Sequence, residues 1–228
     1  MKLLALCLAL LATLPAHADP AKWLKEVTVY EAADAKKAPE KGGIVFIGSS
    51  SIRLWKTLKN DFPKHNVIGR GIGGSQIEDS VFYADRLIFP YEPRMVVLYA
   101  GGNDINAGKT ADRVVADFEA FVAKVRSKLP NAEIAYISIA GNPARWKQVE
   151  TIKEANRRIE EITKKEKGLK FIDVFSKMMG PDGTPQPDIF VADRLHMNEK
   201  GYAIWTEVVT PYLGKPDEKP AETKGSAN

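Results

Sequence analysis

The sequence predicts a three-layer α/β/α sandwich around a mainly parallel sheet. Five short apolar runs rich in β-branched residues alternate with segments of helical periodicity. Runs this apolar are typical of strands covered on both faces, and regular alternation with helices is typical of a parallel sheet. The 228 residues are 44% hydrophobic and 27% charged, which suits a globular chain. This composition excludes a disordered chain, a collagen-like fibre and a multi-spanning membrane protein.

The elements follow one another in a regular order along the chain. The expected strands are 44–47, 66–68, 95–99, 134–139 and 171–174. The expected helices are 23–35 (an extra helix on the body), 111–129, 147–167 and a last one to Pro211 that Asn198 caps. We expect one domain over residues 19–213. Residues 214–228 contain two prolines, many charges and no large apolar side chain, which predicts a disordered tail.

Residues 1–18 have the pattern of a secretory signal peptide. Lys2 precedes an apolar run from Leu3 to Leu14, and Ala16-His17-Ala18 is a small-residue cleavage site. A membrane anchor is the alternative, but at ~1.5 Å per residue the run covers roughly 18 Å, less than a ~30 Å bilayer core. We therefore expect an exported protein, periplasmic or extracellular, with no integral membrane segment after cleavage.

Cleavage limits the chemistry that the mature chain can use. It removes Cys7, which is the only cysteine, so the domain has no disulfide, and it leaves two histidines, His65 and His196. A zinc site of the usual Cys/His kind is therefore nearly excluded, and we expect neither a metal nor an organic cofactor. The net charge is +4, but basic residues are interleaved with acidic ones, so no nucleic-acid partner is expected.

The loops after the first two strands contain serines and glycines. Ligands of parallel α/β sheets bind beyond the carboxyl ends of the strands. In Gly48-Ser49-Ser50-Ser51, a serine at a helix N-terminus either acts as a nucleophile or only caps the helix. Gly69, Gly71 and Gly74 match the dinucleotide fingerprint G-x-G-x-x-G, but they follow the second strand rather than the first. We therefore expect a tight loop, or a backbone N–H directed at an oxyanion.

Two further loops contain an amide and an acid–histidine pair. Asn103 in Gly101-Gly102-Asn103-Asp104 is either an oxyanion-hole donor or part of an Asn/Asp turn, and we expect Asp104 to order the loop. Asp193 precedes His196 by three residues, so a helical turn would bring its carboxylate to Nδ1–H of a general base. A surface aspartate beside a packed histidine is the alternative. His65 has no such partner.

Together the four segments resemble the four blocks of the SGNH hydrolases, also called GDSL esterases/lipases, in the same chain order. The resemblance spans roughly 43–211. It implies a flavodoxin-like fold with strand order 2-1-3-4-5. It also implies that Ser50 is the nucleophile, His196 the base and Asp193 its orienting acid. The implied oxyanion hole consists of the backbone N–H groups of Ser50 and Gly74 and the side-chain amide of Asn103.

The first two blocks leave some assignments open. The family's first block usually reads G-D-S, and Ser49 stands where that aspartate would be. Spacing from Gly48 favours Ser50 as the nucleophile, with Ser51 next. A slip of one residue in the second block would replace Gly74 by Gly73.

The resemblance implies a serine esterase, and the signal-peptide pattern indicates that it is secreted. Because few long apolar stretches lie beyond the core, we expect it to act on short acyl, in particular O-acetyl, esters of small molecules or glycans. Lysophospholipase or thioesterase activity, or a non-catalytic envelope protein that binds acylated glycans or lipids, are the alternatives. Arg145 and Trp146 follow the fourth strand on the catalytic edge and are candidate substrate-binding residues. Otherwise Trp146 packs on the following helix and Arg145 faces water. The sequence leaves the oligomeric state undetermined.

Overall fold

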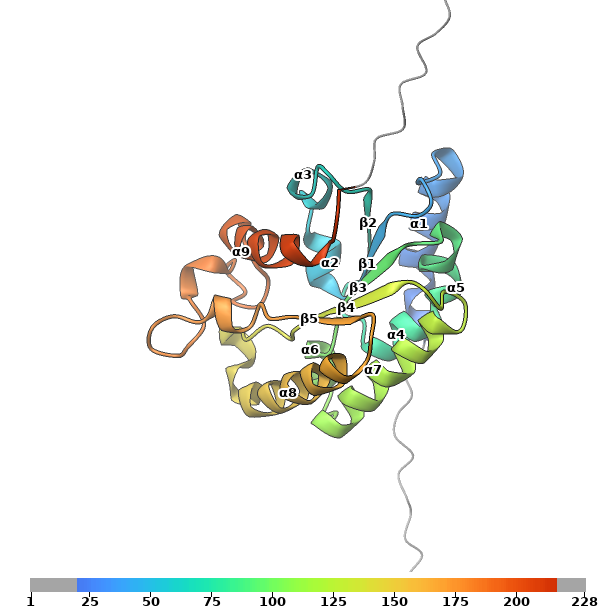
Figure 1. The fold of residues 1–228 in the computed structure, drawn as a ribbon. Helices are drawn as coiled ribbons and strands as arrows, with labels where there is room; N and C mark the ends of the chain where they lie inside the picture. Colours follow the sequence, from blue (N-terminus) through green and yellow to red (C-terminus); the bar gives the residue numbers. More distant parts are fainter. Residues whose placement is uncertain (1–19, 217–228) are drawn as a thin grey trace, which may run out of the picture.

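The computed structural model describes residues 20–216 and contains a sheet between two layers of helices (Figure 1). The strands are β1 Ile44–Gly48, β2 Val67–Gly71, β3 Met95–Tyr99, β4 Glu133–Ile137 and β5 Leu169–Ile172. Their order is β2-β1-β3-β4-β5, and every neighbouring pair is parallel. The predicted fold class is therefore confirmed. The predicted signal peptide, and the predicted tail after residue 216, lie outside the described residues.

Nine α-helices are described in this part of the chain. They are α1 Leu24–Lys36, α2 Ser50–Leu54, α3 Leu58–Asp61, α4 Ile77–Phe82, α5 Ala84–Leu87, α6 Gly102–Asn106, α7 Ala111–Arg126, α8 Val149–Lys165 and α9 Glu199–Val209. Short 3-10 helices are η1 Pro20–Trp23, η2 Phe89–Tyr91, η3 Pro143–Gln148, η4 Ser176–Met178, η5 Pro187–Ile189 and η6 Thr210–Tyr212. Asn198 caps α9 as expected, because its Oδ1 accepts from the backbone N–H groups of Lys200 and Gly201. None of the helices within residues 20–216 is long and apolar enough to cross a bilayer.

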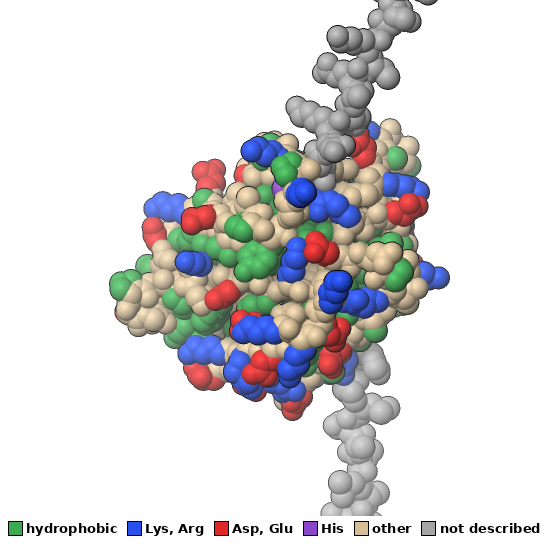
Figure 2. Space-filling view, viewed as in Figure 1, with side chains coloured by type: hydrophobic (Ala, Val, Ile, Leu, Met, Phe, Trp, Pro, Cys, Tyr) green, Lys and Arg blue, Asp and Glu red, His purple; other side chains and the backbone are tan. Residues whose placement is uncertain are grey.

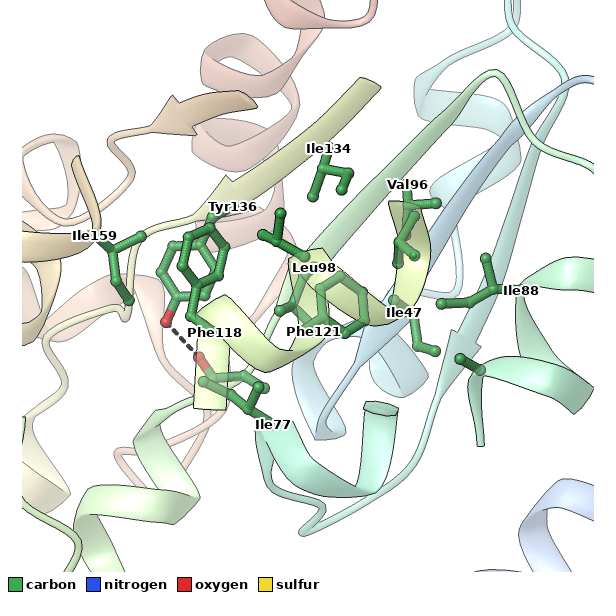
Figure 3. Packing of buried hydrophobic residues seen from close by; sticks show 14 of the residues in the cluster. Ile47, Ile77, Ile88, Val96, Leu98, Phe118, Phe121, Ile134, Tyr136 and Ile159 are labelled. Atoms are coloured by element: carbon green, nitrogen blue, oxygen red, sulfur yellow. Dashed lines mark hydrogen bonds between the residues drawn. The ribbon is translucent and has the colours of Figure 1, made fainter. Parts of the chain in front are cut away.

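Successive strand residues point into two separate cores, because side chains alternate across a sheet. One core lies under α1, α4, α5, α7 and α8, where Leu98 and Tyr136 of the sheet pack with Phe118 and Phe121 of α7 (Figure 3). The other lies under α2, α3 and α9, where Phe46 of β1 belongs to the same cluster as Trp205 of α9. The apolar strands are thus covered on both faces, as the sequence indicated.

Four strands end at residues other than the predicted ones: β1 and β2 extend to Gly48 and Gly71, beyond residues 47 and 68, and β4 and β5 end early. At the two early ends, side chains bind the backbone. β4 ends at Ile137 rather than residue 139, since the Asn156 side chain of α8 binds both the N–H and the C=O of Ile139. β5 ends at Ile172 rather than residue 174, since the N–H groups of Val174 and Phe175 both donate to Ser138 Oγ. In each case the side chain forms hydrogen bonds with backbone groups that would otherwise continue the hydrogen bonding between neighbouring strands.

The expected extra helix, α1, is fastened to β2 and to the loop that follows it. The Arg70 guanidinium of β2 donates to both carboxylate oxygens of Asp34 at 2.7 and 2.9 Å. Tyr30 donates to the Gly71 carbonyl at 2.7 Å. At the start of the helix, the Trp23 ring lies so close to Gly74 that a Cβ there would be 3.2 Å from it. The contacts of Tyr30 and Trp23 therefore hold α1 against the loop that contains Gly74.

Acidic and basic side chains are interspersed over the face shown in Figure 2. On α8, for example, Arg157 pairs with Glu154 and Glu161. The interleaved charges of the sequence thus lie on solvated helix surfaces. Alternating positive and negative charges along a helix face are typical of a solvent-exposed helix.

Candidate active site

The structure brings Ser50, His196 and Asp193 together at the carboxyl edge of the sheet. Ser50 is the first residue of α2, directly after β1, and His196 lies just before α9. His196 Nε2 is 2.9 Å from Ser50 Oγ, and His196 Nδ1 is 2.6 Å from Asp193 Oδ2. These distances allow the ring to accept a proton from the hydroxyl on one side while its other nitrogen donates to the carboxylate.

Asp193 reaches the histidine through a tight turn and not through the predicted helical turn. Arg194 adopts a left-handed conformation with φ of 59°. Asp193 Oδ1 accepts from the N–H groups of Leu195 and His196, each at 2.9 Å, which leaves Oδ2 for the ring. The hydrogen bonds from the His196 ring and from these backbone groups lower the pKa of Asp193 to about 2. The carboxylate is therefore charged wherever the imidazole can act as a base.

The structure distinguishes among the three consecutive serines. Ser50 contacts His196, whereas the buried Ser51 has its side chain hydrogen-bonded to Tyr99 and its carbonyl bonded to Tyr202. Ser49, which replaces the expected aspartate, is 6% exposed and precedes α2 in an extended conformation. Its N–H donates to the Tyr99 carbonyl at 2.9 Å. Ser50 is thus the serine whose hydroxyl the base can reach.

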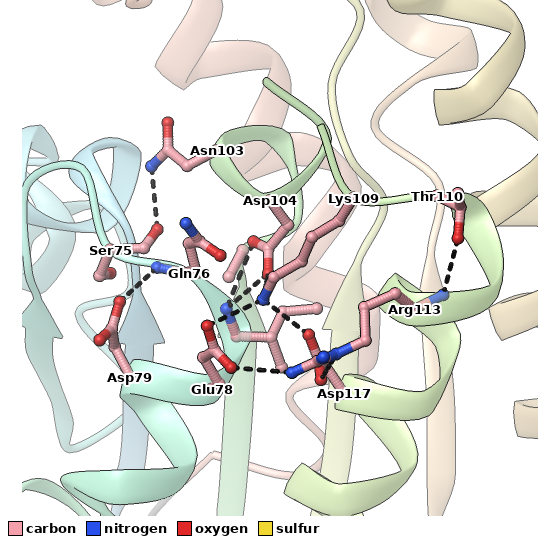
Figure 4. Close-up of polar contacts among 12 residues, drawn as sticks. Ser75, Gln76, Glu78, Asp79, Asn103, Asp104, Lys109, Thr110, Arg113 and Asp117 are labelled. Carbon is pink, nitrogen blue, oxygen red and sulfur yellow. Dashed lines mark hydrogen bonds and ion pairs between the residues drawn. The ribbon is translucent and has the colours of Figure 1, made fainter. Parts of the chain in front are cut away.

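The loops that hold the expected oxyanion donors are tied together. Asn103 Nδ2 donates to the Ser75 carbonyl at 2.9 Å (Figure 4), so Asn103 is joined to the loop that contains Gly74. Gly74 has φ of 85°, which favours glycine. Among the described residues, the N–H groups of Ser50 and Gly74 have no hydrogen-bond partner. The structure thus leaves these two donors and the second Nδ2–H of Asn103 uncommitted, and their role in an oxyanion hole stays a prediction.

Asp104 is fully buried below Asn103 and orders the loop, as expected. Its carboxylate accepts from the Ile77 N–H at 3.2 Å and pairs with Lys109 at 3.1 Å. Lys109 also pairs with Asp117 at 2.8 Å, in a cluster that joins α4, α6 and α7 (Figure 4). Burial raises the pKa of Asp104, and the Lys109 charge opposes this. The residue next to Asn103 is therefore held in place by hydrogen bonds and ion pairs.

Only one of the two candidate substrate-binding residues lines the cavity around Ser50. Arg145 lies there with His196 and Asn103, and its Nη1 donates to Asn103 Oδ1 at 3.0 Å. Trp146 is half-buried outside this lining and lies against Gly141, where a Cβ would be 3.2 Å from its ring. Substrate binding by Trp146 stays a prediction.

The glycines of the G-x-G-x-x-G pattern do not lie together in one turn. Gly69 and Gly71 lie within β2 rather than in the turn after a strand. A Cβ at Gly71 would be 2.2 Å from the Arg53 N–H nitrogen, so this glycine permits the close approach of α2. Within residues 20–216, no cluster of three or more His, Cys, Asp or Glu side chains is placed to hold a metal ion.

The chain matches one protein family over most of its length. The model of the GDSL-like lipase/acylhydrolase family matches residues 48–204, from the end of β1 into α9. The match therefore includes all four segments that form the site. No curated protein matches the chain.

Solved structures show the same fold. A GDSL-like lipase from Bacteroides thetaiotaomicron superposes with a TM-score of 0.70 at 21% identity, over 82% of this chain and 96% of that one. An acetyl-xylooligosaccharide esterase from Geobacillus stearmophilus gives 0.61 at 15% identity, over 80% and 99%. A carbohydrate esterase family 3 protein from Talaromyces cellulolyticus gives 0.56 at 17% identity, over 75% and 96%.

The Asp193 carboxyl provides a direct test of the Asp–His contact. We expect a pKa of about 2, and His196→Ala should raise it toward its ordinary ~3.9, because the ring contributes most to the shift. Since the folded-state pKa is the lower one, the contact stabilises the fold above pH ~3.9, and this contribution is lost as the pH falls toward 2. Carboxyl ¹³C NMR, assigned with Asp193→Asn, measures the titration.

Asp188 is the control for this titration. Its pKa is lowered by Lys200 rather than by the histidine, so it should not move in His196→Ala. An Asp193 pKa that stays near 2 without the ring would contradict the assigned cause.

Proposed function

Since the chain belongs to the GDSL-like lipase/acylhydrolase family and is a carboxylic ester hydrolase, we propose that it is an exported serine esterase that removes short acyl groups, O-acetyl groups in particular. The observation that carries this proposal is the continuous chain of contacts from Ser50 Oγ through His196 to Asp193. Such a chain is the usual means of activating a serine hydroxyl, which is a weak nucleophile at its free pKa.

In the proposed mechanism His196 Nε2 takes the hydroxyl proton while Ser50 Oγ attacks the ester carbonyl carbon. Asp193 keeps the proton on Nδ1 and stabilises the imidazolium. The negative carbonyl oxygen is held by the N–H groups of Ser50 and Gly74 and by the Asn103 amide. When the tetrahedral intermediate collapses, the alcohol leaves with the proton from Nε2. Water then attacks the acyl-enzyme by the same route, which releases the acid and frees Ser50.

The size of the cavity supports a small acyl group. The space enclosed by Ser50, His196, Asn103 and Arg145 is about 30 Å³. Its walls carry hydroxyl, amide and guanidinium groups, which suit a polar alcohol part better than an aliphatic chain. Two neighbours in fold act on carbohydrate esters by name, one of them on acetyl-xylooligosaccharides. An acylated carbohydrate is therefore the substrate class we favour.

A second cavity favours a different substrate class. It measures about 480 Å³, lies between α2 and α9, and includes the apolar side chains of Leu54, Met197 and Ala203. Met197 directly follows the proposed base, so a long acyl chain that extends from Ser50 over this surface would bury apolar area. This is the observation in favour of a lysophospholipase or a long-chain thioesterase.

The nucleophile can be tested with neighbouring serines. Ser50→Ala should lower kcat on p-nitrophenyl acetate by about 10⁴-fold or more, because the remaining site retains only transition-state binding. Ser51→Ala is the matched control and should stay within about threefold, since the Ser51 side chain bonds Tyr99 and not the base. Mass spectrometry after treatment with a fluorophosphonate should place the label on Ser50. Binding of acylated ligands without labelling would instead support a non-catalytic binding protein.

Substrate class can be tested by a panel of esters. We expect kcat/KM to be highest for acetylated saccharides and acetyl esters and to fall as p-nitrophenyl esters lengthen from acetate to octanoate, because the cavity at Ser50 is small. Lysophosphatidylcholine and a long-chain acyl thioester represent the second class. A kcat/KM that rises with chain length, and falls again when Ala203→Trp fills the α2–α9 cavity, would support the second class instead.

Export is proposed from the pattern of residues 1–18. When the full chain is expressed in a bacterium with a general secretion system, the protein in the periplasm or medium should begin at Asp19. N-terminal sequencing measures this. A chain that keeps Met1 and stays in the cytoplasm would contradict export without bearing on esterase activity.

A further inference from the structure

The side chain of Asn103 is held at both ends of its carboxamide. Its Nδ2 donates to the Ser75 carbonyl at 2.9 Å, and its Oδ1 accepts from Arg145 Nη1 at 3.0 Å. Figure 4 shows the nitrogen turned toward Ser75, with the oxygen on the opposite side. Because the carboxamide is planar and carries two N–H bonds, fixing both ends also fixes the direction of the second Nδ2–H.

Arg145 is a half-buried cation in the cavity that contains Ser50. It lies there with His196, and burial lowers the pKa of its guanidinium. Among residues 20–216, no carboxylate lies within ion-pair distance of it, whereas Arg70, Arg86, Arg113, Arg157 and Arg158 each pair with an acid. A buried charge without a counter-ion is costly. The Arg145 guanidinium thus lies in the cavity with Asn103 Oδ1 as a hydrogen-bond acceptor and with no acid among the described residues to neutralise it.

The backbone around Arg145 is held as firmly as its side chain. Its N–H donates to Asn142 Oδ1 at 3.0 Å, and Asn142 itself is buried. The N–H of the preceding Ala144 donates to the Arg194 carbonyl at 3.1 Å, next to the Asp193–His196 turn. The guanidinium is thus fixed relative to both the base and Asn103.

We propose that Arg145 is a positioning residue of the oxyanion hole that acts through Asn103. Its bond to Oδ1 holds the carboxamide so that the free Nδ2–H points to the carbonyl oxygen attacked by Ser50. The positive charge also polarises the amide, and a polarised donor binds an oxyanion more strongly. This inference deepens the proposed esterase function and rests on it. Direct binding of an anionic substituent of the substrate by the guanidinium is the competing role, which the experiments below distinguish.

A double-mutant cycle tests whether Arg145 acts through Asn103. On neutral p-nitrophenyl acetate, Asn103→Ala should lower kcat by about 10²–10³-fold, and Arg145→Ala by about 10-fold with KM within about twofold. In the Asn103→Ala background, Arg145→Ala should cost less than about twofold, because the group it positions is absent. Arg145→Lys keeps a charged donor and should recover part of kcat. An equal fall in kcat in both backgrounds would overturn the proposal.

Esters of different charge test the competing role. With p-nitrophenyl hemisuccinate, which carries a carboxylate, Arg145→Ala should have the same effect as with the acetate ester. A rise in KM confined to the hemisuccinate would show direct anion binding and overturn the proposal. Arg157→Ala on the exposed face of α8 is the matched control and should leave both rates unchanged. Thermal unfolding of each variant confirms that it is folded.

A readout without turnover separates this inference from the proposed function. The side-chain NH₂ signals of Asn103, assigned by their loss in Asn103→Ala, should shift in Arg145→Ala and less in Arg145→Lys, while Arg157→Ala leaves them in place. Unchanged signals in Arg145→Ala would overturn the positioning role. If the wild-type chain hydrolyses no ester but the signals shift, the proposed function fails and the contact stands.

Discussion

The backbone at Gly48 is the constraint on which the site depends. This residue ends β1 with φ of 136°, and a Cβ there would lie 1.9 Å from the Tyr99 carbonyl oxygen. Only glycine lets the ends of β1 and β3 approach so closely. The Gly48 carbonyl in turn accepts from the Ile72 N–H at 2.8 Å and from Ser75 Oγ at 3.2 Å. The Gly48 carbonyl, and the absence of a side chain at Gly48, thus hold together the three loops that contain Ser50, Gly74 and Asn103.

The proposed base, His196, comes from near the other end of the chain, and its segment is held by short-range contacts. The Val191 N–H donates to the His196 carbonyl at 2.9 Å, which closes the turn that contains Asp193. Asn198, besides capping α9, donates from Nδ2 to the Asp188 and Phe190 carbonyls. Tyr202 of the same helix donates to the Ser51 carbonyl at 2.9 Å, which fixes α9 relative to α2. The distance between His196 and Ser50 is therefore set by helix packing, and the orientation of the ring by Asp193.

The fold class and the place of the site loops could be predicted from the sequence, because they depend on local residue patterns and on the rule that the carboxyl ends of parallel strands lie at one edge of the sheet. Apolar runs and helical spacing were enough for the fold class, and the edge rule placed the loops of Ser50 and Asn103 at one edge of the sheet. The grouping of His196 with them came from the resemblance to a known family. Strand ends were misjudged where a distant side chain binds the backbone, as Asn156 does at Ile139. The residue pattern alone could not decide between Ser50 and Ser51, because the directions of their side chains depend on where α2 begins. Along a helix each residue is rotated by about 100° from the one before it. The contact between Arg145 and Asn103 joins loops 42 residues apart and has no local signal.

In the proposed mechanism, positive charge forms on His196 and negative charge forms beside Asn103, so the charged groups around Ser50 affect both. Asp193, ionised down to a pH of about 2, stabilises positive charge on His196. On the opposite side, Arg145 is the nearest cation to Asn103, where negative charge would develop. Asp104 opposes this, because it is buried directly beside Asn103, and its pairing with Lys109 offsets part of its charge. The buried cluster of Lys109, Asp104 and Asp117 therefore has an electrostatic consequence besides holding α6 in place. Lys109 also pairs with Glu78 and Asp117, and Arg113 pairs with the same two acids, so two cations face three carboxylates. The cluster thus reduces, without cancelling, the repulsion between Asp104 and negative charge that forms beside Asn103.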